Sequence, residues 1–383
     1  MSEKESLAVV SSLVNIVTGD FSNEAVPRED GDLPTFTHLV AGVFLYHPES
    51  HRFLVQRRSM SRPSYPGFFT DSASGYVHAD PDLDLEAIKA EMCRELEEEM
   101  GVVTSTADLR FWTIYYSAKT NEIKFVFTGT VATDAFTIDE DEVCREGSGW
   151  YTVADLDQIL HSEPFISSSA GLWEALVALE PTYAQLYNGL EPWQEFWTQF
   201  DDLARFRSWM AESSPSEPVP VYLGRFQPLH RGHLECFRQI RERSGTIVVA
   251  VGSAQYGGIP GNPLSFAERR GMISAVLEGE GLEFDRAFII PLPDIHQEKL
   301  WMQNVHLLLG DGVIIHSNND WVRDLAAAEG YPVADKFEFD VEHLNGTRVR
   351  ALLHDGEDWA SLVPGSCLAY LEEHGLVEKI RTA

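Results

Sequence analysis

The sequence predicts a protein of two domains, in the α/β and α+β classes, whose second domain is a doubly wound parallel sheet. Three observations lead to this prediction. The 383 residues exceed what one domain usually holds. The stretch Ser213–Pro218 is rich in serine and proline, as linkers are. After this stretch strand-like and helix-like segments alternate, which is typical of a parallel sheet, whereas several strand-like segments and one long helical pattern precede it.

Domain limits follow from the same patterns. We interpret residues 1–34 as a leader containing a short helix, 35–165 as the first domain, 166–217 as a helical connector with the linker, and 218–383 as the second domain. The expected strands of the first domain are 39–46, 53–57, 110–117, 123–132 and 150–153, beside a helix over 85–100. Those of the second domain are 221–224, 246–252, 287–291 and 312–316.

The chain is strongly acidic, with 60 acidic and 29 basic residues and a formal net charge of −31. It has no run of Lys and Arg, so its field repels nucleic acid and anionic membranes. The four cysteines have no metal-ligand spacing and are interpreted as reduced thiols. We recognise no signal peptide and no membrane span, and therefore expect a cytoplasmic protein whose partners are small nucleotides. The oligomeric state stays open, a homo-oligomer included.

The predicted helix 85–100 carries a group of carboxylates on one face. Glu95, Glu98 and Glu99 are three and four residues apart, which brings their side chains together on a helix. Crowded carboxylates repel one another unless a cation neutralises them. Such hard oxygen ligands suit Mg²⁺ or Mn²⁺, which lower the pKa of bound water and bridge a diphosphate. The carboxylates alone leave a solvated acidic helix as an equal alternative.

The register of these residues favours the metal site. Glu86, seven further residues and the run Arg94–Val102 resemble the Nudix box at every defined position. The resemblance implies that Glu95, Glu98 and Glu99 hold metal and activate water, that Arg94 orients Glu95 at the substrate, and that Glu86 supports the metal site. It covers residues 38–165 and implies an α/β/α sandwich with a mixed sheet. One departure is that Gly75 stands farther from Glu86 than the glycine of the family pattern does.

Two further segments resemble the Nudix branch that includes isopentenyl diphosphate isomerases. These are Gln56–Arg58 and the Ser-Ala-Ser-Gly run that ends at Gly75. The isomerases need a catalytic cysteine near the glycine run, and the nearest cysteine here is Cys93, within the helix. We therefore expect a hydrolase.

The second domain opens with a strand, a glycine turn and a helix that starts near two histidines. The strand ends at Gly224, and His230 and His233 follow at the start of the helix. A helix N-terminus beside a glycine turn favours an anion, because its N–H groups are free and its dipole is positive there. Two histidines at that point can donate to charge that develops on a phosphate.

Gly224 to His233 resembles the archaeal-type nicotinamide-nucleotide adenylyltransferase family. Four later stretches agree with it: Gly252–Tyr256, Asn262–Arg269, Pro293–Val305 and Leu344–Arg350. Asn345 replaces the usual serine, and Ser317–Asn319 replaces Ser-Gly-Asn. The match spans residues 219–380 and implies a Rossmann-like nucleotidyltransferase.

The resemblance implies that a mononucleotide phosphate attacks the α-phosphorus of ATP, with Mg²⁺ or Mn²⁺ on the departing pyrophosphate. His230, His233 and Arg350 are the implied catalytic residues, and Arg225 and Arg269 are further clamps on ATP. Trp301 is expected to stack on the nicotinamide ring. The other implied substrate contacts are Gly224, Phe226, Gln227, Ser253, Asn262, Asp294, Asn319, Asn345, Gly346 and Thr347.

Together the two patterns predict a bifunctional enzyme of NAD metabolism. Its second domain makes NAD from ATP and nicotinamide mononucleotide, and its first hydrolyses a nucleoside-diphosphate derivative such as ADP-ribose. One alternative is adenylyl transfer to another acceptor, such as pantetheine phosphate or a flavin mononucleotide. Another is that the Nudix domain senses a nucleotide and regulates the transferase. A nucleotide-sensing transcription factor would need a basic winged-helix segment, which we do not find.

Overall fold

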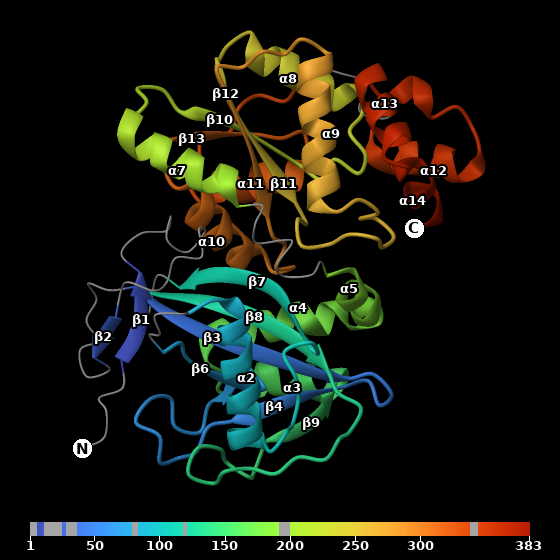
Figure 1. The fold of residues 1–383 in the computed structure, drawn as a ribbon. Helices are drawn as coiled ribbons and strands as arrows, with labels where there is room; N and C mark the ends of the chain where they lie inside the picture. The colour runs from blue at the N-terminus through green and yellow to red at the C-terminus, as the bar shows by residue number, and fades with distance from the viewer. Residues whose placement is uncertain are drawn as a thin grey trace. The chain divides into compact units, whose positions relative to one another are not determined.

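A computed structural model of the chain describes residues 6–10, 25–27, 37–78, 83–117, 121–190, 200–337 and 344–383. The chain divides into two compact units (Figure 1). The first unit is Met1–Asn188 with Ile295–Leu307, and the second is Gly189–Asp294 with Leu308–Ala383. None of the helices within the described ranges is long and apolar enough to cross a membrane.

The first unit is built on a mixed sheet of nine strands. Its central strand β3 (Thr37–His47) runs parallel to β8 (Glu122–Thr130) and antiparallel to β4 (Arg52–Arg57) and β6 (Ala73–Tyr76). The other strands are β1 (Ser6–Val10), β2 (Ala25–Pro27), β5 (Phe69–Thr70), β7 (Leu109–Ser117) and β9 (Gly149–Thr152). The five predicted strands of the first domain all lie within one to two residues of observed ones, and the mixed sheet is confirmed.

Two helices cover opposite faces of this sheet. A Cβ on Gly75 would lie 3.6 Å from Cδ of Glu95, which belongs to α2 (Leu85–Met100). Gly75 pairs with Ala41 of β3, and Phe44 lies three residues along the same strand, so Phe44 points to the other face. There its ring packs on Trp173 of α4 (Ser167–Leu179), with 4.6 Å between centroids. The carboxylate helix and α4 therefore lie on opposite faces of the sheet.

Helix α2 has the predicted limits because both ends carry the right residues. The side chain of Asp84 accepts from the Ala87 amide at 2.8 Å, which caps the first turn. Gly101 ends the helix with φ 60°, a conformation that glycine adopts without strain. The buried stripe is Leu85, Ile88, Lys89, Met92, Leu96 and Met100, which leaves the glutamates on the outer faces.

Two segments differ from the prediction. The short helix expected in the leader is wrong for residues 6–10, which form β1 and pair with β3 through Val9 and His38. A short apolar run does not distinguish strand from helix by its period. Of the remaining leader, only residues 25–27 are described, and they form β2. Helix α4, predicted as part of the connector, belongs to the first unit, where Trp173 Nε1 donates to the Thr70 carbonyl at 2.9 Å.

Three more short elements complete the first unit. They are α3 (Val153–Ser162), η2 (Glu180–Thr182) and α5 (Tyr183–Gly189). The ring of Tyr183 lies 4.6 Å from the ring of Tyr46, so the chain is still packed on the sheet where α5 begins. Trp193 and Trp197 of the predicted connector lie outside the described residues.

The second unit has a four-stranded parallel sheet in the order β12-β11-β10-β13, which confirms the predicted fold class. The strands are β10 (Val219–Gly224), β11 (Thr246–Gly252), β12 (Arg286–Leu292) and β13 (Val313–His316). Its helices are α7 (Asp201–Ser213), α8 (Arg231–Arg241), α9 (Phe266–Gly279), α11 (Asp320–Ala328), α12 (Gly346–Asp355), η3 (Ala360–Leu362), α13 (Gly365–Glu373) and α14 (Leu376–Thr382). Helix α10 (Glu298–Leu309) begins in the segment that groups with the first unit.

Strand order places the ligand edge of this sheet. Strands β11 and β12 lie on one side of β10, and β13 lies on the other, so the order reverses between β10 and β13. Ligands of open parallel sheets bind at the carboxyl ends of the strands near such a reversal. Gly224 ends β10 at that edge.

Candidate functional sites

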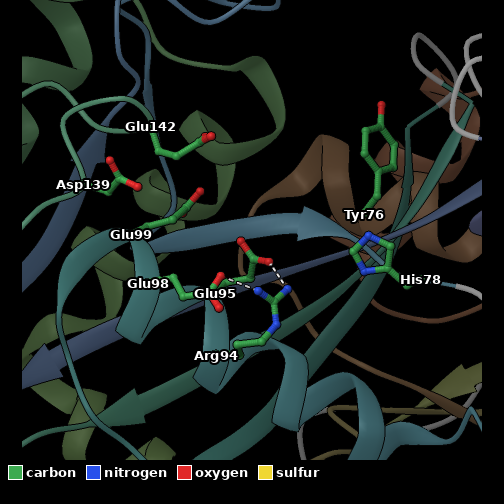
Figure 2. Close-up of a pocket in the computed structure, with 8 residues that line it drawn as sticks. All are labelled: Tyr76, His78, Arg94, Glu95, Glu98, Glu99, Asp139 and Glu142. Atoms are coloured by element: carbon green, nitrogen blue, oxygen red, sulfur yellow. Dashed lines mark hydrogen bonds and ion pairs between the residues drawn. The ribbon is translucent and has the colours of Figure 1, made fainter. Parts of the chain in front are cut away.

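The outer face of α2 borders an acidic pocket of about 300 Å³. Five of its lining side chains are carboxylates, namely Glu95, Glu98, Glu99, Asp139 and Glu142. Figure 2 shows these carboxylates and Arg94 facing the hollow, with Tyr76 and His78 on another side. The structure thus brings the three predicted metal ligands together and adds two acids from a later loop.

Arg94 neutralises part of this charge. Its guanidinium contacts Glu95 at 2.5 Å and also pairs with Glu98. On its other side it holds Glu91 at 2.6 Å. These ion pairs occupy carboxylate oxygens that a metal would need. In the described part of the chain, no three His, Cys, Asp or Glu side chains are already arranged to bind a metal ion.

Burial and mutual repulsion disfavour the ionised forms of Glu95 and Glu99. Burial, followed by the charge of Glu95, raises the pKa of Glu99 to about 7. Burial also raises the pKa of Glu95. Gln56 Nε2 donates to Glu99 at 2.9 Å, which holds the carboxylate in place without removing its charge. A divalent cation that takes oxygen ligands fits this donor set, because it would favour the ionised form of both groups.

Glu86 does not join the pocket, contrary to its predicted role at the metal site. It lies nine residues before Glu95, which is two and a half helical turns, so the two side chains point to opposite sides of α2. Its carboxylate instead accepts from Lys89 Nζ at 3.2 Å. Helical geometry alone was enough to exclude Glu86.

Sequence reasoning missed several residues of this site. Glu91 lies one turn before Glu95 on the same face, so the spacing that grouped the three glutamates also predicts it. Asp139 and Glu142 come from the loop after β8, where the Asp139 amide donates to the Glu99 carbonyl at 3.1 Å. Tyr76 is the last residue of β6, and His78 follows that strand. No local spacing relates these loop residues to α2.

The second site is built where β10 ends and α8 begins. His230 is the N-cap of α8, and its backbone amide donates to His233 Nδ1 at 3.2 Å. The two imidazoles stack with 3.7 Å between centroids. Because His233 Nδ1 accepts, the neutral ring carries its proton on Nε2 and can donate there. His230 Nδ1 is buried and has no partner among the described residues.

Burial keeps both imidazoles neutral. It lowers the pKa of His230 to about 4, and burial with the neighbouring His230 lowers the pKa of His233 well below its usual range. A histidine that is neutral when folded but titrates near pH 6.5 when unfolded destabilises the fold as the pH falls from about 6.5 toward 4.

We therefore expect His230→Gln to flatten the loss of stability on acidification. Between pH 7 and pH 5 the wild-type chain should lose about 2 kcal/mol more than the variant, because each pKa unit is worth about 1.4 kcal/mol. Thermal unfolding midpoints of both proteins at the two pH values measure this. Equal losses would show that His230 is protonated in the fold at pH 5.

A second helix N-terminus meets the same loop. Asn345 caps α12, accepting from the Arg348 amide at 2.9 Å. Arg350 Nη1 donates to the Gln227 carbonyl at 2.6 Å. A Cβ on Gly346 would lie 3.2 Å from that same carbonyl, so glycine permits the close approach. Two positive helix ends and Arg350 thus converge on the turn after Gly224, which suits a polyphosphate.

Arg269 is buried, whereas its predicted role as a clamp on ATP requires it to be exposed at the phosphate site. Its side chain is fully buried, with 0% of the residue exposed. Its guanidinium donates to several backbone carbonyls, including Gly252 at 2.7 Å and Arg225 at 3.2 Å. It ties the end of β11 to the loop after β10. The structure supports a positioning role rather than contact with ATP.

Arg269→Met should therefore unfold the second unit at lower temperature rather than weaken only ATP binding. The substitution strips donors from several buried carbonyls, and such losses cost about 1–3 kcal/mol for each unsatisfied group. Thermal unfolding measures the effect, with exposed Arg348→Met as the matched control. An unchanged unfolding midpoint with a large loss of ATP binding would instead support the predicted role of Arg269 as a phosphate clamp.

The remaining predicted ligands fall into two groups. The Gln227 side chain is occupied, because it donates to and accepts from the backbone of Leu264 at 2.8 and 2.9 Å. Ser253 Oγ donates to Asp294 at 3.1 Å, at the ends of β11 and β12. Residues that lie at the same carboxyl edge or beside the turn are Arg225, Phe226, Asn262, Asn319 and Thr347. Asn262 Oδ1 is buried without a partner among the described residues.

Trp301 lies in a segment that groups with the first unit. It lies within Ile295–Leu307, and 6% of the residue is exposed. In the same segment Asn304 Nδ2 lies 3.5 Å from Thr113 Oγ1 of β7. Its stacking on nicotinamide stays a prediction.

Comparison with known proteins supports a nucleotidyltransferase site in the second unit. Residues 221–342 match the Cytidylyltransferase-like family model. The nicotinamide-nucleotide adenylyltransferase of Pyrococcus furiosus is 32% identical over 162 residues, which are 42% of this chain and 86% of that protein. The enzyme of the same name from Pyrobaculum aerophilum is 34% identical over 164 residues, covering 43% and 92%.

One similar solved structure is a bifunctional NMN adenylyltransferase/ADP ribose pyrophosphatase from Francisella tularensis. It is 21% identical, with 44% of this chain and 50% of that chain covered and a TM-score of 0.34. Similarity at that level assigns no activity to the first unit. The match to the Pyrococcus furiosus enzyme covers most of that enzyme, so this chain belongs to the nicotinamide-nucleotide adenylyltransferase family.

Proposed function

We propose that the second unit transfers AMP from ATP to nicotinamide mononucleotide, giving NAD and pyrophosphate. The observation that carries this proposal is the stacked pair His230 and His233 at the N-terminus of α8, in a chain of the adenylyltransferase family. The mononucleotide phosphate attacks the α-phosphorus of ATP, and the bond to the β-phosphate oxygen breaks. No covalent enzyme intermediate is needed.

The residues around the turn supply position and charge for this reaction. The N-termini of α8 and α12 present amide groups to the triphosphate, and Arg350 adds a fixed positive charge. Neutral His233 donates from Nε2 to an oxygen of the phosphate chain. An adjacent triphosphate favours the protonated imidazole, so its donation strengthens as charge builds up on the departing pyrophosphate.

We further propose that the first unit hydrolyses a nucleoside-diphosphate derivative, with ADP-ribose as the first candidate. The acidic pocket on α2 and the Nudix-box register of Glu95, Glu98 and Glu99 support this. These three carboxylates, with Asp139 and Glu142, would hold Mg²⁺ or Mn²⁺, which lowers the pKa of bound water and screens the diphosphate charge. Gln56 positions Glu99, and Arg94 positions Glu95.

Two assays on one preparation test both activities. ATP is offered with nicotinamide mononucleotide, nicotinate mononucleotide, pantetheine phosphate or flavin mononucleotide, and ADP-ribose is offered separately with Mg²⁺ or Mn²⁺. Chromatography should show NAD with pyrophosphate in the first assay, and AMP with ribose 5-phosphate in the second. A preferred acceptor outside the pyridine mononucleotides would overturn the transferase proposal. Tight binding of ADP-ribose without turnover would favour a sensing role for the first unit.

A further inference from the structure

The acidic pocket contains a cation of its own, Arg94, which contacts the carboxylates that metal would use. Its guanidinium reaches Glu95 at 2.5 Å and pairs with Glu98. A divalent cation and this guanidinium compete for the same oxygens, because two positive charges held on one carboxylate repel each other. Metal uptake therefore requires Arg94 to give up part of its contact with both glutamates.

Glu91 is another ion-pair partner of Arg94, outside the proposed metal site. Its two oxygens face the guanidinium side-on, with Oε1 2.6 Å from Nη2 and Oε2 3.2 Å from Nε. This bidentate geometry is the strong form of an arginine–carboxylate pair. Glu91 lies on the opposite side of Arg94 from Glu98, because one is three residues before it and the other four after it.

His78 fixes Glu91 in turn. Its Nδ1 lies 2.9 Å from Oε1 of Glu91, the same oxygen that Arg94 Nη2 contacts. The hydrogen bond from His78, followed by Arg94, lowers the pKa of Glu91 to about 2, so this carboxylate keeps its charge. Its side chain is 21% exposed, and it is not among the residues that line the pocket. Glu91 is thus a charged anchor beside the site rather than a ligand within it.

We propose that Glu91 is a positioning residue that holds Arg94 while Glu95 and Glu98 turn to a divalent cation. The proposal rests on the proposed hydrolase and names a residue outside the Nudix-box positions. Without the Glu91 charge, Arg94 stays on Glu95 and Glu98. The cation must then displace the guanidinium, which weakens cation binding. His78 serves the same function through Glu91.

Mn²⁺ binding to the full-length, metal-free chain tests this without substrate. Titration followed by calorimetry gives the dissociation constant, and Glu98→Gln with Glu99→Gln identifies the portion of binding that belongs to this pocket in so acidic a chain. Glu91→Gln should raise the dissociation constant about tenfold, the effect of losing one charge-assisted contact. Glu97→Gln is the matched control, because it removes one exposed charge from the same helix and has no contact with Arg94 among the described residues.

A double-substitution cycle shows whether Glu91 affects Mn²⁺ binding through Arg94 or by direct contact with the metal. In the Arg94→Gln background, Glu91→Gln should have no further effect on Mn²⁺ binding, because the competing guanidinium is gone. An equal loss in both backgrounds would make Glu91 a metal ligand and overturn the proposal. So would equal dissociation constants for Glu91→Gln and Glu97→Gln, or a wild-type pocket that binds no Mn²⁺. Intact Mn²⁺ behaviour without hydrolysis of any diphosphate would count against the proposed hydrolase alone.

Discussion

His233→Ala is expected to lower the rate of NAD formation by about 10² to 10³, which is typical for the loss of one preorganised donor to a developing charge. The reason is local geometry. The His230 amide occupies His233 Nδ1 at 3.2 Å, so the neutral ring can donate only from Nε2. The imidazole is also neutral in the free protein, because burial lowers the pKa of His233 well below its usual range. Alanine removes this donor and leaves the helix N-terminus in place.

The measurement is the steady-state rate with saturating ATP and nicotinamide mononucleotide. Hydrolysis of ADP-ribose by the same preparation is the internal control, because His233 lies in the second unit and the acidic pocket lies in the first. His233→Asn is a useful companion, since its amide can still donate. Near wild-type turnover in His233→Ala, with the control activity intact, would remove His233 from the mechanism.

The features that sequence predicted well are local in the chain. The limits of α2 follow from Asp84, Gly101 and the buried stripe between them, whose residues recur every three to four positions. In the structure the helix begins and ends at the predicted residues. The histidine pair and the strand before it are also neighbours in sequence. Capping and periodicity act within a few residues, so they can be assessed without a fold.

The features that sequence predicted poorly depend on distant contacts. Arg269 has the residue type of a phosphate ligand, and only the fold reveals that it is buried among carbonyls of two loops. Asp139 and Glu142 reach the pocket from a loop about forty residues after α2. The grouping of Trp301 with the first unit likewise depends on the path of the chain between β12 and β13. Glu86 and Glu91 are a separate case, because helical geometry already excluded the first and indicated the second.

Replacing both Glu98 and Glu99 by glutamine should abolish metal-dependent hydrolysis while adenylyl transfer stays within a few-fold of wild type. The two carboxylates are central to the proposed metal site, and glutamine is a poor ligand for Mg²⁺ or Mn²⁺ by comparison. The fold should tolerate the change. Glu99 is half-buried, and desolvation raises its pKa to about 7, so its charge is already unfavourable in the metal-free protein. The Glu98 side chain is 60% exposed, and exposed ion pairs contribute about 0–1 kcal/mol.

Both activities and the thermal unfolding midpoint are measured on the full-length double variant. His230, His233 and Arg350 of the phosphate site lie in the second unit, and the substituted glutamates lie in the first. We therefore expect chemistry at one site to need no residue assigned to the other. Trp301 is the exception, because the family resemblance implies that it contacts the nucleotide. If transfer falls together with hydrolysis while the midpoint is unchanged, the two sites are coupled. Trp301→Ala would then show whether that coupling involves the segment 295–307, because a raised KM for the mononucleotide alone is expected if its ring stacks on the substrate.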